Sequence, residues 1–360
     1  MQKDSKKFLF DLLTTPSPSG FEQKIQKVVK KRMSGFADEI RLDVHGNLAA
    51  VFNPAGRVKV MLAGHCDQIG MMVTHIDDKG FIYCNQIGGI DPTVLPGSDI
   101  VIHSESGPVP GVIGFKPVHL TSASERGKPI EFSKAWIDIG ADSGAEVKKI
   151  VSVGDSITFK LAVTDLKNNR IASPGCDDKV GVFVVMEALR IISSKVKGAN
   201  KKKFPVALYA VSTVQEEIGL RGARTSAFGI DPLVGIAVDV THASDNPGAE
   251  AKRIGTMTLG EGAGIARGPN INPELEKLLI STAKKKKIPV QIYAAPNATG
   301  TDANAIQVTR SGVAAGLVSI PNRYMHTPVE IIDLSDLEAA AKLLAETIMN
   351  ITSRMDFIPK

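Results

Sequence analysis

The sequence predicts an α/β protein, a three-layer α/β/α sandwich with a small all-β domain inserted into it. Apolar runs typical of buried strands, such as residues 204–211, alternate with segments that carry a helical apolar stripe, such as residues 180–192. Residues 73–160 differ, because they are rich in Gly and Pro and contain only short β-type runs such as 99–102 and 155–159. We therefore expect a discontinuous catalytic domain of residues 1–72 and 161–360 around an inserted domain of residues 73–160.

Helix starts support this division. Ser19 and Glu22 have the spacing of a capping box, and an apolar stripe follows them as far as Met33. Asn272 before Pro273 is typical of a helix N-cap followed by proline at the first helical position. Further helical stripes follow residue 177 and begin again at residue 335.

The most informative residues are the adjacent acids Glu216 and Glu217, which follow the apolar run 204–211. They are therefore expected at a strand end, where the ligands of α/β sheets usually bind. Adjacent carboxylates repel each other and are costly to bury unless a cation or a shared proton offsets their charge. One of them can ligate a metal while the other transfers protons, although a solvated turn is the alternative.

Four other segments place potential ligands after an apolar run or before a helix. They contribute His65 with Asp67, Asp177 with Asp178, Asp239, and His326. Each alone is weak, because a histidine beside a strand is more often a structural residue. Together, two histidines and several carboxylates at one sheet edge indicate a mixed nitrogen and oxygen site that suits Zn, Co or Mn better than Ca or Mg.

Five motifs resemble, in the same order, those of a known family. This is the dinuclear metal aminopeptidase family of glutamyl and deblocking aminopeptidases and TET-type peptidases, some relatives of which are labelled endoglucanases. The motifs are GHCDQIG at 64–70, GCDDK at 175–179, QEEIG at 215–219, VDVT at 238–241 and RYMHTPVE at 323–330. The resemblance covers nearly the whole chain.

The resemblance implies two divalent metal ions per chain, with Zn or Co favoured and Mn also suitable. Asp177 would bridge the two metals. His65 and Asp239 would complete one site, and Glu217 and His326 the other.

It also implies roles for two further acids. Glu216 would be the general base that deprotonates a water between the metals, and Asp67 would orient the imidazole of His65. The peptide bond between Asp177 and Asp178 is expected to be cis, as in the family.

The sequence departs from the family pattern in two places. Gln68 stands where Glu is common, and residues 298–299 are Ala-Thr within a run that is usually richer in glycine. We expect both near the entry of a substrate side chain, where they bear on specificity. Asp302 can contact the free amino group of a substrate or hold the bend before it, and Arg267 can face substrate or be merely exposed.

Composition agrees with an enzyme of this kind. The chain has 360 residues and 43% hydrophobic content, enough for a substantial core, and it has no apolar run of 18 residues. The charged N-terminal segment lacks a signal-type apolar block, and three cysteines cannot all pair, so a cytoplasmic location is expected. Cys66 and Cys176 neighbour proposed ligands, but we expect them to pack as small buried side chains.

The net charge of +5 is modest, and the lysine clusters at 201–203 and 284–287 have no interleaved aromatic residues. No nucleic-acid or membrane partner is expected.

The function that the resemblance implies is removal of N-terminal residues from peptides. The inserted domain would mediate homo-oligomerisation, from a dimer up to a dodecamer. One alternative is another amide hydrolase, such as a deacylase, and a second is a non-catalytic assembly protein, against which the intact Glu216 argues. A glycosidase would leave His65 and His326 unexplained.

Overall fold

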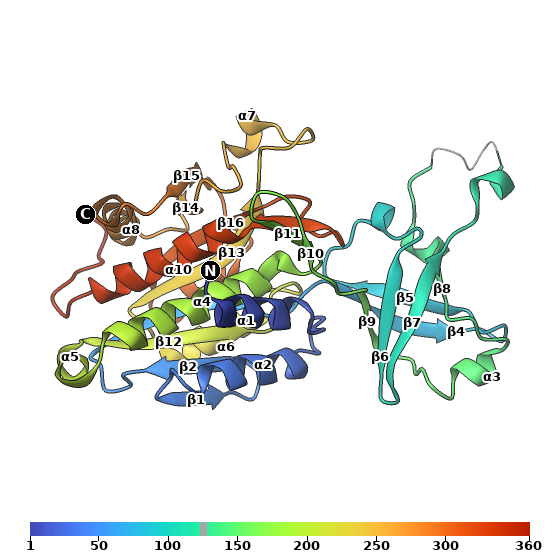
Figure 1. Cartoon of the computed structure of the whole chain (residues 1–360), viewed down its shortest axis with the longest axis horizontal. Helices are drawn as coiled ribbons and strands as arrows, with labels where there is room; N and C mark the ends of the chain where they lie inside the picture. Colours follow the sequence, from blue (N-terminus) through green and yellow to red (C-terminus); the bar gives the residue numbers. More distant parts are fainter. Residues whose placement is uncertain (123–127) are drawn as a thin grey trace.

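The computed structural model describes residues 1–122 and 128–360, and it shows an α/β sandwich from which a β-barrel projects at one end (Figure 1). Both termini lie on the sandwich. The predicted fold class is confirmed.

An eight-stranded sheet forms the middle layer, in the order β1-β2-β12-β3-β13-β16-β14-β15. Strands β12, β3, β13 and β16 are parallel neighbours, so their carboxyl ends meet at one edge. The bounds are β1 (Glu39–Leu42), β2 (Leu48–Phe52), β3 (Val58–His65), β12 (Val206–Thr213), β13 (Val234–His242), β14 (Ala263–Arg267), β15 (Val290–Ala294) and β16 (Ala314–Asn322).

Helices cover both faces of this sheet. Along β3, Val60 and Leu62 belong to the core on one face, whereas Met61 and Ala63 belong to the core on the other, as the period-2 geometry of a strand requires. The first face packs against α1 (Lys3–Leu13), α2 (Gln23–Met33), α4 (Cys176–Lys195), α8 (Pro273–Lys286) and α10 (Leu334–Met349). The second face packs against α6 (Arg221–Ile230) and α9 (Asp302–Gln307), while α5 (Gly198–Lys203) and α7 (Ala251–Ile254) are short peripheral helices.

The barrel has its own hydrophobic core and closes in the order β4-β5-β8-β7-β6-β9. Its strands are β4 (Gly70–Ile76), β5 (Ile82–Ile87), β6 (Asp99–Ser104), β7 (Gly107–Gly114), β8 (Trp136–Asp138) and β9 (Ser156–Phe159). Three 3₁₀ turns, η1 (Pro92–Val94), η2 (Val118–Leu120) and η3 (Phe132–Lys134), and the short helix α3 (Gly144–Val147) also belong to this segment, so it is not purely β. A three-stranded sheet of β10 (Thr164–Asp165), β11 (Arg170–Ser173) and β17 (Glu330–Asp333) completes the fold.

The two predicted helix starts have different outcomes. The Asn272 side chain accepts hydrogen bonds from the amides of Glu274 and Leu275, so the N-cap of α8 is confirmed. The capping box at Ser19 is wrong, because α2 begins only at Gln23 and the Ser19 hydroxyl donates to Asp67 instead. Within the described residues, no helix combines the length and the apolar character needed to cross a membrane.

Candidate active site

The carboxyl edge of the four parallel strands brings together the residues that the sequence predicted as metal ligands. His65 ends β3 and Asp239 lies within β13, three residues before its end. Glu217 follows β12, Asp177 lies in the first turn of α4, and His326 follows β16. These five side chains line one cavity of about 470 Å³ together with Glu216.

Asp177 lies between the two imidazoles. Its Oδ1 is 3.1 Å from Nε2 of His65, and its Oδ2 is 3.2 Å from Nε2 of His326. Both histidines therefore direct the same ring nitrogen toward opposite oxygens of one carboxylate. The peptide bond between Asp177 and Asp178 is cis, as expected.

The remaining acids surround this centre. Oε2 of Glu217 is 3.6 Å from Nε2 of His326, whereas Oε2 of Glu216 and Oδ1 of Asp239 are 3.8 and 3.9 Å from Nε2 of His65. The arrangement separates into two groups, each with its ligand atoms within 4.8 Å of one another: His65 with Asp178 and Asp239, and Asp177 with Glu217 and His326.

Burial of so many carboxylates has an electrostatic cost. Burial, opposed by His65 and assisted by repulsion from Asp239, raises the pKa of Glu216 to about 10. Burial raises the pKa of Asp239 to about 8, again against the attraction of His65. Divalent cations would favour the charged forms, so the donor set fits metal ions. The Oε1 atom of Glu217 is also buried without a hydrogen-bond partner among the described residues, which leaves it free to coordinate.

Asp178 belongs to the first group by position but is already engaged by the backbone. Its Oδ2 accepts a hydrogen bond from the amide of His65 at 3.2 Å, and its Oδ1 accepts one from the amide of Gly181 at 3.1 Å. The first bond ties the start of α4 to the end of β3, and the second lies within α4. The ligand of the first group is therefore better supplied by Asp177, whose Oδ1 faces His65.

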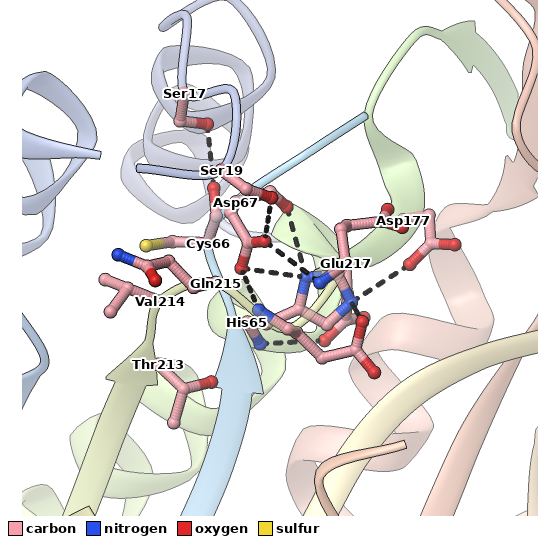
Figure 2. A network of polar contacts seen from close by, with 12 residues as sticks. Ser17, Ser19, His65, Cys66, Asp67, Asp177, Thr213, Val214, Gln215 and Glu217 are labelled. Carbon is pink, nitrogen blue, oxygen red and sulfur yellow. Dashed lines mark hydrogen bonds and ion pairs between the residues drawn. The ribbon is translucent and has the colours of Figure 1, made fainter. Parts of the chain in front are cut away.

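Asp67 lies directly behind His65 (Figure 2). The Nδ1 atom of His65 is 3.1 Å from the carbonyl oxygen of Asp67 and 3.5 Å from its Oδ1. A carbonyl oxygen only accepts, so Nδ1 carries the proton and Nε2 is left to bind a cation. The backbone carbonyl of Asp67 is thus closer to the imidazole than its carboxylate is.

Glu330 is a site residue whose role the sequence analysis missed. It is buried, its Oε2 accepts from the amide of Asp177 at 2.9 Å, and its Oε1 accepts from the amide of His326 at 3.0 Å. It therefore holds the backbone of two predicted ligands at once. It ends the motif RYMHTPVE, but its partner Asp177 is 153 positions away, and no sequence spacing reveals that contact.

Asp302 is buried at the start of α9, where only 2% of it is exposed. Its Oδ2 accepts a hydrogen bond from the Thr213 hydroxyl at 2.6 Å, while its Oδ1 has no partner in the part of the chain that the structure describes. The neighbouring Gly300 and Thr301 line the cavity. Asp302 thus lies behind the cavity wall, with one oxygen uncommitted.

Two other expectations about substrate contacts are not supported. Arg267 is largely exposed at the end of β14 and pairs with Glu276, its Nε lying 2.6 Å from Oε1, and it is not among the described residues that line the cavity. Gln68 is 1% exposed, and its Oε1 accepts a hydrogen bond from the buried ammonium of Lys179. Gln68 therefore completes a buried lysine contact and is not among the described residues that line the cavity.

An α/β sandwich that collects histidines and carboxylates at its strand ends belongs to the class of α/β proteins whose site suits divalent metal ions. The chain belongs to the M42 glutamyl aminopeptidase family, a family of metal-dependent peptidases whose model matches residues 46–343. This membership confirms the family that the sequence motifs indicate.

Known aminopeptidases are similar to this chain in both sequence and structure. A lysyl aminopeptidase of Pyrococcus furiosus is 38% identical over 351 residues, covering 97% of both chains. The structure is similar to a TET aminopeptidase of a marine sediment archaeon, Thaumarchaeota archaeon SCGC AB-539-E09, with a TM-score of 0.91, 33% identity and 97% coverage of both chains.

Two further solved structures bear on assembly and naming. The TET1 peptidase of Pyrococcus horikoshii, described as assembling into a tetrahedron or a large octahedral shell, has a TM-score of 0.84 and 28% identity over 96% of this chain and 100% of its own. A Thermotoga maritima protein labelled endoglucanase has a TM-score of 0.75 and 30% identity, over 95% and 98% of the two chains. The expected endoglucanase-labelled relatives therefore exist.

Proposed function

We propose that this chain is an aminopeptidase that uses two divalent metal ions, Zn or Co before Mn, to remove N-terminal residues from peptides. One observation carries the proposal: the Asp177 carboxylate lies between Nε2 of His65 and Nε2 of His326, at 3.1 and 3.2 Å. A carboxylate shared in this way is suited to bridge two cations. Asp239 would complete the site at His65, and Glu217 the site at His326.

The chain's own residues supply the remaining chemistry. Two cations held there would polarise the scissile carbonyl and lower the pKa of a water, so no Ser or Cys nucleophile is required. Glu216 lines the same cavity and ligates neither centre in this scheme. It would take a proton from the attacking water and return it to the leaving amine nitrogen as the C–N bond breaks. Asp67 would keep Nδ1 of His65 protonated and the ring fixed.

We propose that residues 73–160 are the assembly domain of a homo-oligomer. The barrel exposes the large apolar side chains of Val112, Leu120, Ile150 and Val153, of which Leu120 is 69% exposed. Apolar side chains presented to solvent on a small domain favour burial against another surface. The assembly of the similar TET1 peptidase into a tetrahedron or a large octahedral shell supports homo-oligomerisation, and the proposal allows a dimer or a dodecamer.

We also propose a cytoplasmic location. Cys66 and Cys176 are buried in the sandwich core, as expected, and Cys84 is half-buried in the barrel. None of the three forms a disulfide within the described residues. Unpaired thiols are typical of proteins in a reducing compartment.

Metal removal tests the catalytic proposal. Chelation should abolish cleavage of aminoacyl fluorogenic substrates, and Zn, Co or Mn added to the stripped protein should restore it. Elemental analysis of the restored protein should find two ions per chain. Cleavage that persists in protein shown to contain no metal would contradict the proposal.

A further inference from the structure

The turn that carries Glu216 and Glu217 is held by side chains at four consecutive backbone amides. The amide of Val214 donates to Oδ1 of Asn47 at 3.1 Å, and the amide of Gln215 donates to Oε1 of Glu22 at 3.2 Å. The amides of Glu216 and Glu217 donate to the two carboxylate oxygens of Asp67, at 3.0 and 3.1 Å. The backbone amides of residues 214–217 are therefore all held by side chains from outside the turn.

An N-terminal turn of residues 17–22 supports both Asp67 and this catalytic turn. The Ser17 hydroxyl donates to the carbonyl of Cys66 at 2.7 Å, and the Ser17 carbonyl accepts from the amide of Gln68 at 2.9 Å. The Ser19 hydroxyl donates to Oδ2 of Asp67 at 2.5 Å (Figure 2). The N-terminal turn precedes residues 46–343, the stretch matched by the family model.

Glu22 is the member of this turn that reaches the catalytic turn directly. It is 4% exposed, and one atom, Oε1, accepts from both the amide of Gly20 at 2.7 Å and the amide of Gln215 at 3.2 Å. Gln215 has a φ of 55°, in the left-handed region that non-glycine residues rarely occupy. Such a conformation persists only where the surroundings impose it, and the bond to Glu22 is one of the contacts that impose it.

We propose that Glu22 is a positioning residue that fixes the backbone of Gln215 and thereby the direction of the Glu216 carboxylate. The effect on catalysis rests on the proposed function of Glu216, whereas the restraint on the backbone does not. The role depends on an acceptor atom at the position of Oε1. It does not depend on the negative charge, because the amide oxygen of glutamine offers the same acceptor.

A matched pair of substitutions separates the acceptor from side-chain volume. Glu22→Gln keeps an acceptor at Oε1, while Glu22→Met keeps the length and volume but leaves the amides of Gly20 and Gln215 unsatisfied. Hydrogen exchange of a peptide covering residues 213–218, measured on the metal-free chain, should be at least about tenfold faster in Glu22→Met and unchanged in Glu22→Gln. Equal exchange in the parent and Glu22→Met, or equally fast exchange in both variants, would overturn the proposal.

Kinetics of the metal-loaded chain give an independent readout. Glu22→Met should lower kcat by about tenfold, the scale of one lost hydrogen bond, with KM and metal content unchanged. Glu22→Gln should stay within about threefold of the parent kcat. A Glu22→Met variant with the parent's kcat, or a loss confined to KM, would contradict a role in positioning Glu216.

Misfolding of Glu22→Met, or failure of the aminopeptidase proposal, can each be told apart from failure of the positioning role of Glu22. If Glu22→Met does not fold, Glu22→Asp withdraws the acceptor by one methylene while keeping the charge, and it should give the same faster exchange. Slow exchange in Glu22→Asp would then refute the proposal. A parent chain without aminopeptidase activity would refute the proposed function alone, since the exchange comparison needs no substrate.

Discussion

Glu216 and Glu217 are neighbours in sequence, but their carboxylates lie on different sides of the centre. Glu217 lies 3.6 Å from His326, and Glu216 lies 3.8 Å from His65. In the proposed scheme Asp177 and Asp239 would ligate the same metal ion as His65, so Glu216 would be the acid left for proton transfer. Different roles for Glu216 and Glu217 would explain why two adjacent acids are buried here, which a solvated turn would not explain.

The substitution Glu216→Gln tests that division. It should lower kcat by at least ~10²-fold, the usual scale for loss of a general base, while the chain still binds about two metal ions. Steady-state kinetics and elemental analysis would be carried out on the same preparation, with the exposed Glu261→Gln as the control. Near-parental turnover in Glu216→Gln would require a different base.

The convergence of the predicted ligands on one cavity could be expected, because each follows a recognisable strand or belongs to a recognisable motif. Their supporting partners could not be predicted, because Glu330, Ser19 and Glu22 reach the site from distant segments through one or two hydrogen bonds each. Ser19 and Glu22 show the difficulty most clearly. Their spacing satisfies a capping box, but both side chains are used on neighbouring loops, so local pattern and tertiary contact give different answers.

At the scale of single elements, α8 shows a prediction that depends only on local chemistry. Oδ1 of Asn272 accepts from the amides of Glu274 and Leu275, each at 3.0 Å, and its Nδ2 donates to the carbonyl of Phe357 at 2.8 Å. The N-cap therefore also ties the C-terminal segment to the sandwich. The pattern Asn-Pro was sufficient to predict the start of α8, because both cap bonds are made to amides within three residues of Asn272.

Asn272→Ala should lower the free energy of unfolding by about 1 kcal/mol, the typical cost of a lost N-cap. Urea unfolding followed by circular dichroism would measure the change. The exposed Ser281→Ala in the same helix should change stability by less than about 0.5 kcal/mol. An Asn272→Ala variant as stable as this control would show that the cap contributes nothing.

The barrel should lose stability in acid through His103 on β6. Burial, assisted by Lys24 and Lys179, lowers the pKa of His103 to about 4, and its Nε2 is 2.9 Å from the Thr158 hydroxyl. Between about pH 6.5 and 4 the unfolded chain therefore binds a proton that the folded chain does not, so the free energy of unfolding falls as the pH is lowered.

His103→Gln removes that titration while retaining a polar side chain. Urea unfolding of metal-free parent and variant at pH 7, 5.5 and 4.5 should show the parent losing stability relative to His103→Gln as the pH falls. A stability difference that is independent of pH across this range would mean that His103 is not the group responsible.

At the scale of the whole molecule, the barrel is proposed for assembly and the sandwich for catalysis, and two chain connections join them. Strands β4 and β9 pair antiparallel, with Met72 opposite Ser156, so the two connections to the barrel lie close together. A short linker can therefore replace residues 73–160 without stretching the sandwich.

That replacement should leave a folded α/β domain but a smaller particle. Light scattering should give fewer chains per particle for the deleted chain than for the full chain, because the exposed apolar side chains of the barrel are removed. Circular dichroism would verify that the sandwich remains folded. An unchanged number of chains per particle would place the interface on the sandwich.

The proposed aminopeptidase function requires that the site cleaves next to a free N-terminal amine. Asp302 has an uncommitted buried oxygen beside the cavity-lining Thr301, and Glu216 lines the cavity itself, so the surroundings are acidic. A charge-assisted hydrogen bond to a substrate ammonium contributes about 1.5–3 kcal/mol, so acetylating the amine should lower kcat/KM by roughly ten- to a hundredfold.

Matched peptides that differ only in N-terminal acetylation, digested by the metal-loaded chain and followed by mass spectrometry, test this claim most directly. The free peptide should lose its first residue before any internal bond is cut, while the acetylated peptide should be cleaved far more slowly. Equal cleavage of both peptides, or an internal cut made first, would contradict the aminopeptidase assignment, and release of the acetyl group would favour a deacylase.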